Sequence, residues 1–160
     1  MLLYLLRHAK TDQLSITGKD FDRKLLKKGV NQAAVLGKYF EEHQINPAHI
    51  YCSTAARTRQ TISGIQKNHS FDQKVIFKDE LYLCGKDVLL NFLWSEHHGE
   101  DVLIIGHNNG ISDFAEYLID DFVELKTGEL IVIEFDAELW NETSQGTGTI
   151  VRRFRPVIVD

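Results

Sequence analysis

The sequence predicts an α/β fold, a three-layer α/β/α sandwich with a mostly parallel sheet and an antiparallel strand at one edge. Short apolar runs alternate with segments of helical periodicity, an order typical of parallel strands joined by crossover helices. The last two apolar runs, residues 130–135 and 149–154, follow one another with only a polar loop between them, which indicates antiparallel pairing. A chain of 160 residues is expected to form one domain over residues 1–160.

Four apolar runs are expected to supply the parallel strands. The first, Leu2–Leu6, has five consecutive apolar residues and no helical period, which favours a buried strand. Residues 49–52 and 74–77 are shorter runs of the same kind. Residues 101–105 form the clearest strand of the chain and end at Gly106.

Two helices are predicted in the first half of the chain. Between residues 26 and 44, apolar side chains recur at spacings near three and four, which predicts a buried helical face that includes Val30. After the second strand, Ser53 or Thr54 is the expected N-cap of another helix. Arg57 would then lie in the first turn of a helix that directly follows a strand.

Two further helices are predicted in the second half. Residues 87–97 form one, with Val88 in its buried stripe, and residues 111–119 form an apolar one. Residues 10–24 are polar and predict a loop at the end of the first strand, a place where sites are commonly built.

Composition excludes several classes of protein. The formal charge of −5 disfavours a nucleic-acid binder, whose backbone contacts need a basic face. No apolar run approaches the roughly 18 residues of a membrane span, and no signal peptide is evident. Two cysteines, Cys52 and Cys84, make no disulfide framework. We therefore expect a reduced, cytoplasmic monomer that binds neither nucleic acid nor membrane.

Cationic and imidazole side chains follow three of the predicted parallel strands. Arg7 and His8 end the first strand, Arg57 follows the second, and His107 follows the 101–105 strand. In open α/β sheets, ligands bind outside the carboxyl ends of the strands. Because parallel strands point these ends the same way, we expect the four side chains to converge over one crevice.

Phosphoryl transfer is the chemistry that suits this set. Two guanidiniums can bracket phosphoryl oxygens with planar, charge-assisted hydrogen bonds. A neutral imidazole can attack phosphorus and become a phosphohistidine. Positioning and electrostatics account for most of the rate of such transfers. The residues present require neither a metal nor another cofactor.

Three segments resemble the histidine phosphatase (phosphoglycerate mutase-like) superfamily. Residues 7–9 are similar to its Arg-His-Gly/Ala signature. Residues 53–61 resemble its second segment, a Ser, then an Arg, then Gln-Thr in the following turn. Residues 106–108 resemble its late Gly/Ser-His motif. The resemblance extends from Leu2 to about Ile119.

The resemblance implies roles for single residues. His8 would be the phosphorylated nucleophile, and Arg7, Arg57 and His107 would form the phosphate pocket. In this family a backbone carbonyl holds the other ring nitrogen of the nucleophile, which defines its tautomer.

The short chain resembles the small SixA-type phosphohistidine phosphatases. Only Ile62–Lys74 separates the helix of Arg57 from the third strand, which leaves no room for a lid insertion. Residues 20–25, Gly29 and residues 80–82 are also similar to that branch. The resemblance implies a phosphorylated protein as substrate, with phosphate removed from its histidine. A small-molecule phosphomonoesterase and a non-catalytic phospho-binding module remain as alternatives.

A second group of residues completes the expected site. Glu80 follows the third strand and is the candidate general acid, although it can equally be a solvated side chain of a turn. Lys10, Thr11 and Asn108 are expected to line the pocket, and each is also explained as ordinary loop chemistry.

Two other chemistries fit the residues less well. A thiol phosphatase needs five residues between cysteine and arginine, whereas four separate Cys52 from Arg57. A metal site on His8 and His107, extended by His97 and His98, has neither a His-x-x-x-His motif nor a carboxylate cluster beside it. The adjacent histidines are more simply a polar helix end.

Overall fold

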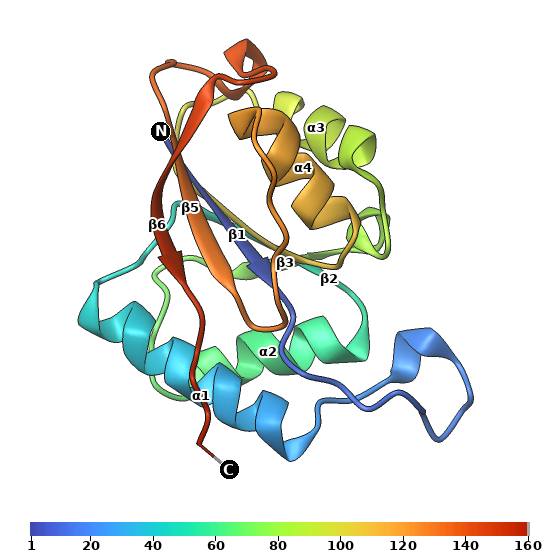
Figure 1. Cartoon of the computed structure of the whole chain (residues 1–160). Coiled ribbons are helices and arrows are strands. Elements are labelled where there is room, and N and C mark those ends of the chain that lie inside the picture. Colours follow the sequence, from blue (N-terminus) through green and yellow to red (C-terminus); the bar gives the residue numbers. More distant parts are fainter. Residues whose placement is uncertain (160) are drawn as a thin grey trace.

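The computed structural model describes residues 1–159 and contains one six-stranded sheet between two layers of helices (Figure 1). The order of strands across the sheet is β3-β2-β4-β1-β5-β6. The strands are β1 (Leu2–Arg7), β2 (His49–Ser53), β3 (Val75–Lys78), β4 (Val102–Gly106), β5 (Leu130–Phe135) and β6 (Gly148–Phe154). The predicted α/β/α class and all six predicted strands are therefore present.

The sheet is parallel in its first four strands and antiparallel at one end. β1 and β2 both pair in parallel with β4, and β2 pairs in parallel with β3. β5 runs antiparallel to β1, and β6 runs antiparallel to β5. The reversed strand therefore lies one position in from the edge, and β6 forms the edge itself.

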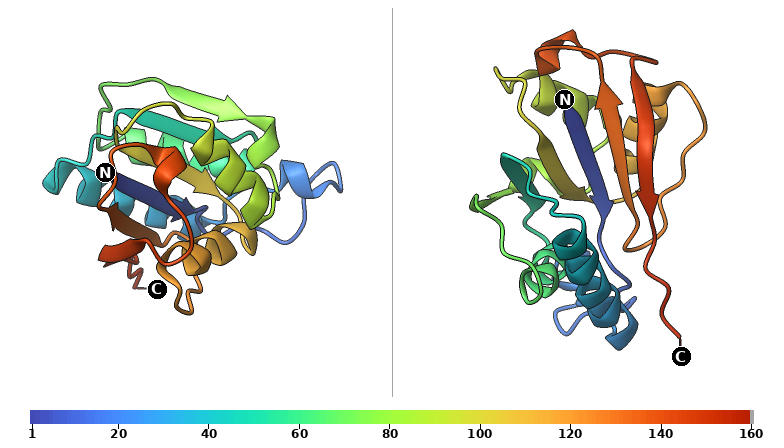
Figure 2. Two further views of the ribbon diagram at one scale, coloured as in Figure 1. Left: turned by 90° about the horizontal axis from the view of Figure 1, so that it is seen from above. Right: turned by 90° about the vertical axis from the view of Figure 1, so that its left-hand side faces the viewer.

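Four helices of the described residues cover the two faces of the sheet. They are α1 (Lys27–Glu42), α2 (Ala56–Gln66), α3 (Lys86–Trp94) and α4 (Gly110–Ile119). α1 packs on α2, and α3 packs on α4, so each face is covered by one pair (Figure 2). Short 3-10 turns are also present, at Asp20–Asp22 (η1), Asp79–Leu81 (η2) and Trp140–Glu142 (η3). Within residues 1–159, no helix combines the length and apolarity that crossing a membrane requires.

Strand β1 shows why the sheet is apolar on both sides. Leu3 and Leu5 point into the core under α3 and α4, while Tyr4 and Leu6 point into the core against α1 and α2. Side chains alternate between faces along a strand, so a strand covered on both faces needs an uninterrupted apolar run. The N-terminal apolar run is buried for this reason.

Two predicted core positions are wrong. Val30 and Val88 are 47% and 42% exposed. In α1 the buried row runs through Ala33, Leu36 and Phe40, and in α3 it runs through Leu89 and Leu93. Each valine lies one position away from its row, which turns it about 100° around the helix toward solvent.

The start of α2 also differs from the prediction. β2 continues through Ser53, and the N-cap of α2 is Ala55, with no side-chain cap. Thr58 instead donates its hydroxyl to the carbonyls of Ser53 and Ala55 at 2.7 and 2.9 Å. Arg57 still lies in the first turn of α2, as predicted. Only residues 67–74 connect α2 to β3, so no lid is inserted there.

Candidate active site

A cavity of about 240 Å³ lies beyond the carboxyl ends of β1, β2 and β4. Its lining consists of Arg7, His8, Lys10, Thr11, Gln13, Asp20, Arg23, Arg57, Leu83, His107, Asn108 and Thr127. Seven of the eight predicted site residues are in this set, and Glu80 is not. The parallel register explains the convergence, because Arg7 is level with Gly106 on the neighbouring strand.

His8 is buried and its tautomer is defined by the backbone. Its Nδ1 lies 2.8 Å from the carbonyl oxygen of Ala9. A carbonyl oxygen only accepts, so Nδ1 carries the hydrogen and Nε2 carries the lone pair. The imidazole of His8 therefore has a nucleophilic nitrogen at Nε2.

Burial and positive charge keep His8 neutral. Burial lowers the pKa of His8 to about 3, and the charges of Arg57, Arg7 and Arg23 act in the same direction, against the hydrogen bond to Ala9. A protonated imidazole has no lone pair to attack with, so this depression keeps His8 in its nucleophilic form at neutral pH.

His107 lies beside His8, with 5.4 Å between the two ring centroids. Its Nε2 lies 2.7 Å from the Oγ of Ser53 at the end of β2, and both residues are buried. The amide of Ala55 already donates to this Oγ, at 3.4 Å. Burial, together with the charge of Arg57, lowers the pKa of His107 to about 3, so this imidazole is also neutral.

Arg57 is held by a residue that the sequence did not single out. Its Nη2 donates to the Oδ2 of Asp20 at 3.0 Å, and its Nη1 donates to the carbonyl oxygen of Asp20 at 2.8 Å. The Arg57 side chain is only 2% exposed. This bidentate contact gives the guanidinium one orientation.

Two further side chains donate hydrogen bonds to Asp20. Tyr82 donates its hydroxyl to Oδ2 at 2.6 Å, and Arg23 donates Nη1 to Oδ1 at 2.9 Å. Although partial burial acts against it, the hydrogen bonds from Tyr82, Arg23 and Arg57 hold the pKa of Asp20 well below its usual range. Asp20 is therefore ionised. Neither Asp20 nor Arg23 is marked by any periodic pattern; only the similarity of residues 20–25 to a known branch pointed to this stretch.

Arg23 brings a third guanidinium to the cavity. Its Nη2 donates to the Oγ1 of Thr11 at 2.7 Å, and its Nε donates to the carbonyl of Asp12 at 2.7 Å. An antiparallel bridge between Thr11 and Leu25 folds the loop back on itself. The loop thereby returns residues 20–23 to the segment that follows His8.

Arg7 and Asn108 share one acceptor. The Nη1 of Arg7 and the Nδ2 of Asn108 each donate to the carbonyl oxygen of Leu125 at 3.0 Å. The Oδ1 of Asn108 also accepts from the hydroxyl of Ser112 in α4. These contacts connect the ends of β1 and β4 to the segment before β5.

The Gln-Thr pair of α2 has a structural role. Thr61 accepts a hydrogen bond from the amide of Ala9 at 3.0 Å, and Gln60 accepts one from the amide of Leu25 at 2.7 Å. Gly29 permits the close approach of α1, because a Cβ there would lie 2.1 Å from the carbonyl oxygen of Lys10. Together these contacts place the backbone around His8.

Three buried side-chain nitrogens within residues 1–159 have no hydrogen-bond partner, namely Nε of Arg7, Nε of Arg57 and Nδ1 of His107. All three residues line the cavity. Buried polar groups are paired as a rule, so unpaired nitrogens on three side chains that line one cavity favour a site for an acceptor-rich anion. A phosphoryl group, with three oxygens, meets this need.

Two residues that the sequence offered as candidates for catalysis lie outside the cavity. Glu80 is exposed in η2 and lines a separate surface hollow with Lys78, Asn91 and Glu96. Cys52 is buried in β2, and burial raises the pKa of its thiol to about 12. A thiol in this state is not a nucleophile at neutral pH.

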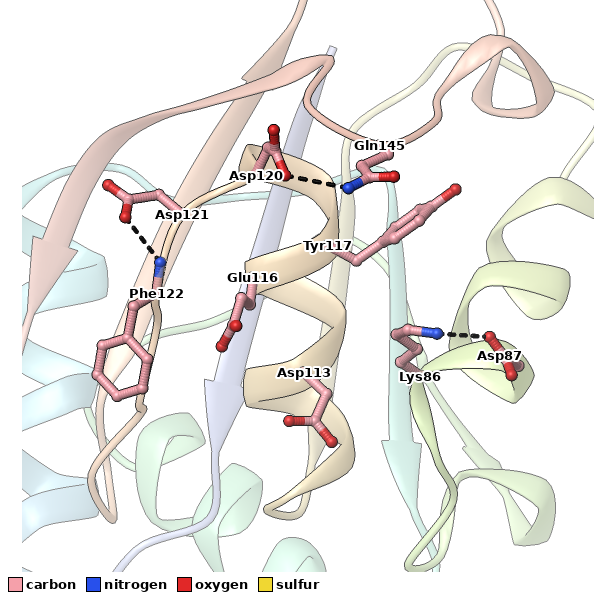
Figure 3. A pocket seen from close by; sticks show the side chains of 9 residues that line it. All are labelled: Lys86, Asp87, Asp113, Glu116, Tyr117, Asp120, Asp121, Phe122 and Gln145. Carbon is pink, nitrogen blue, oxygen red and sulfur yellow. Dashed lines mark hydrogen bonds and ion pairs between the residues drawn. The ribbon is translucent and has the colours of Figure 1, made fainter.

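A larger hollow, of about 580 Å³, lies against α4 and has the wrong charge for an anion (Figure 3). Its lining includes Asp87, Asp113, Glu116, Asp120 and Asp121, with Lys86 as its one cation. Lys86 is paired with Asp87 at 3.0 Å. Carboxylates repel a phosphoryl group, so this acidic hollow does not compete with the cavity of His8.

Known proteins resemble this chain in sequence. Residues 3–82 match the model of the histidine phosphatase superfamily (branch 1). An uncharacterised chloroplastic protein of Arabidopsis thaliana is 27% identical over 150 residues, which cover 88% of this chain and 69% of that protein.

Solved structures show the same fold. A candidate phosphohistidine phosphatase SixA from Nakamurella multipartitia superposes with a TM-score of 0.83 and 26% identity, covering 98% of this chain and 96% of that one. A candidate SixA from Agrobacterium tumefaciens gives a TM-score of 0.76 at 24% identity, covering 97% and 98%. The protein histidine phosphatase SixA complexed with tungstate gives 0.77 at 16% identity, covering 97% of each chain.

Proposed function

Because this chain belongs to the histidine phosphatase superfamily and is a phosphatase, we propose that it removes phosphate from phosphohistidine of a protein through a covalent intermediate on His8. The observation that carries the proposal is the buried imidazole of His8, whose Nδ1 lies against the Ala9 carbonyl in a cavity lined by Arg7, Arg23 and Arg57.

The reaction has two transfers. In the first, Nε2 of His8 forms a bond to phosphorus while the bond from phosphorus to the substrate imidazole breaks, and that imidazole leaves neutral, with a hydrogen on its other nitrogen. In the second, a water oxygen attacks phosphorus and the bond to Nε2 breaks. His8 regains its lone pair, inorganic phosphate leaves, and the proton of the water passes to phosphate or solvent.

The surrounding side chains stabilise the charge on the transferring group. The guanidiniums of Arg7, Arg23 and Arg57 face the equatorial oxygens, where the charge lies in the transition state. When the hydroxyl of Ser53 donates to Nε2 of His107, the hydrogen of His107 is on Nδ1, the atom without a partner. Nδ1–H can then donate to a phosphoryl oxygen.

The absence of a protonated carboxyl around the cavity favours phosphohistidine over an ester. Within residues 1–159, Asp20 is the one carboxyl that lines the cavity, and it is ionised and bound by three donors. An alkoxide needs a general acid to leave, whereas a protonated imidazole on a weak N–P bond does not. The lining therefore supports a phosphoramidate substrate.

Exposed apolar side chains on the loop after β1 favour a protein as the carrier of that phosphohistidine. Leu14 and Ile16 are 79% and 98% exposed on the loop that also contributes Asp20 and Arg23 to the cavity. An open hollow of about 560 Å³ is lined by these two side chains together with Leu25 and Ala56. Exposed apolar surface of this kind is typical of protein docking.

The test compares rates on a protein phosphorylated on histidine with rates on simple phosphate monoesters. We expect preference for the phosphohistidine, complete loss of turnover in His8→Ala, and little change in Glu80→Gln. Trapping a label on the enzyme that is stable in alkali and labile in acid, absent in His8→Ala, identifies the intermediate. Substantial turnover by His8→Ala contradicts the mechanism. Preference for monoesters would instead favour a small-molecule phosphomonoesterase, and no turnover would favour a phospho-binding module.

A further inference from the structure

Two histidines and a glutamate meet at the opposite end of the parallel strands from the cavity. His49 is the first residue of β2, and His98 and Glu100 lie in the segment between α3 and β4. One potential ligand atom from each lies within 4.8 Å of the others. The imidazoles of His49 and His98 are stacked with their centroids 3.9 Å apart, and Nε2 of His49 lies 3.2 Å from a carboxylate oxygen of Glu100.

Hydrogen bonds define which nitrogen of His98 carries a lone pair that a metal could use. Its Nε2 lies 2.8 Å from the carboxylate of Glu96, which accepts, so Nε2 carries the hydrogen. Its Nδ1 carries the lone pair and accepts the amide of Glu100 at 3.1 Å. Tyr51 donates its hydroxyl to the same carboxylate oxygen of Glu96, at 2.8 Å. A carboxylate that accepts the other N–H of a histidine, and is itself anchored, is the usual outer partner of a metal-bound imidazole.

The backbone of the cluster is held by a buried tryptophan. The amide of Trp140 donates to the carbonyl of His98 at 3.2 Å, and its indole Nε1–H donates to the carbonyl of Glu100 at 2.9 Å. The amide of His49 donates to the carbonyl of Asp101 at 3.2 Å, which ties the start of β2 to the same segment. The backbone that carries the three side chains is therefore tied to its neighbours by several hydrogen bonds.

We propose that His49, His98 and Glu100 bind a divalent transition-metal ion of the zinc type. Two imidazole nitrogens and one carboxylate form a donor set that suits Zn²⁺ and leaves a position for solvent. The two imidazoles turn out of their stack so that the ion lies in the plane of each ring. Nδ1 of His98 exchanges the amide of Glu100 for the metal, while Nε2–H stays on Glu96. His49 moves its hydrogen from Nε2 to Nδ1 so that Nε2 can bind.

The ion would act as a clip rather than as a catalyst. It would join the first residue of β2 to the segment that enters β4, two strands that are neighbours in the sheet. An ion that binds the folded chain and not the unfolded chain raises stability in proportion to the logarithm of its concentration over its Kd. The cavity of His8 lies at the other ends of these strands, so turnover does not depend on the clip.

The experiment measures Zn²⁺ binding to the full chain by calorimetry and the thermal midpoint with and without Zn²⁺. We expect one ion per chain and a higher midpoint. His49→Ala and His98→Ala should abolish both effects, and Glu96→Gln should weaken binding by about tenfold to a hundredfold. His97→Ala removes an exposed neighbour outside the cluster and should bind as the wild type does.

His8→Ala tests the competing location, because the cavity also holds two imidazoles. Binding that survives in His8→Ala and is lost in His98→Ala supports the proposal. Failure of the wild type to bind Zn²⁺, or loss of binding in His8→Ala alone, overturns it. Co²⁺ offers a second readout, since its visible absorption spectrum reports imidazole ligation and should change in His98→Ala but not in His97→Ala.

Discussion

Asp20 and Arg57 join the loop after β1 to the first turn of α2. Arg57 uses both terminal nitrogens on this one residue, at 3.0 Å to the carboxylate and 2.8 Å to the carbonyl oxygen. The pair combines a nearly inaccessible guanidinium with a carboxylate that is 41% exposed. Asp20 therefore acts as the anchor that aims Arg57 at the cavity, and it aims Arg23 in the same way.

Removing this anchor should impair catalysis without removing a group that touches substrate. In Asp20→Ala, Arg57 and Arg23 lose their shared acceptor, and we expect kcat/KM to fall by about tenfold to a hundredfold, the usual result of small misplacement. Steady-state kinetics on a phosphohistidine substrate measures the effect. Asp22→Ala is the matched control, since Asp22 lies in the same turn and contacts Thr17 instead. Equal rates for the two variants would disprove the anchoring role.

The four central residues could be predicted from sequence because each lies at or shortly after the end of an apolar run. Arg7, His8, Arg57 and His107 follow strands whose direction is known once the sheet is taken as parallel. Asp20 reaches the cavity only because the loop folds back on itself, and no periodicity encodes such a return.

Other errors of the sequence-based prediction concern which way a side chain points from a helix or a turn. The apolar character of a helix such as α1 or α3 is readable from sequence, but valines one position off the buried row are not distinguished from core residues. Glu80 comes soon after the end of β3, the position expected of a site residue, yet η2 turns it toward a different surface hollow. Strand ends predict which segment approaches a site, and local backbone geometry decides where its side chains point.

Ser53 should act on turnover through His107. In Ser53→Ala the imidazole of His107 loses its hydroxyl partner at Nε2, and the free enzyme no longer favours the Nδ1–H tautomer. We expect kcat to fall by about tenfold while KM changes little, because the donor matters most to the charge of the transition state. Ser53→Thr keeps the hydroxyl and should restore activity. A similar loss in both variants would indicate a packing defect at the end of β2 and not a tautomer effect.

The two cavity histidines should make the fold sensitive to acid. Burial lowers the pKa of His8 and of His107 from 6.5 to about 3. Below pH 6.5 the unfolded chain binds protons that the folded chain refuses, so the free energy of unfolding falls as the pH drops from about 6.5 toward 3. Above pH 6.5 this contribution to stability is fully present.

Denaturant unfolding at a series of pH values measures this dependence. His8→Asn and His107→Asn each remove one of the two groups and should flatten the slope between pH 6.5 and 4. His43→Asn changes an exposed histidine at the end of α1 and should leave the slope as it is. A wild-type stability that is constant over this pH range would show that His8 and His107 are protonated as readily in the folded chain as in the unfolded chain.

Leu14 and Ile16 should distinguish a protein substrate from a small one. Burying one such side chain contributes about 1.5–3 kcal/mol, and each 1.4 kcal/mol is a factor of ten, so Leu14→Ser with Ile16→Ser should lower kcat/KM on a phosphorylated histidine-phosphotransfer protein by about tenfold or more. The rate on free phosphohistidine should stay the same, because the loop still supplies Asp20 and Arg23. Phe122→Ser removes an apolar side chain that is 75% exposed, far along the chain in the acidic hollow, and should alter neither rate. A loss of rate on both substrates would mean that the double substitution disturbs the cavity. Unchanged rates on both would show that Leu14 and Ile16 do not take part in substrate binding.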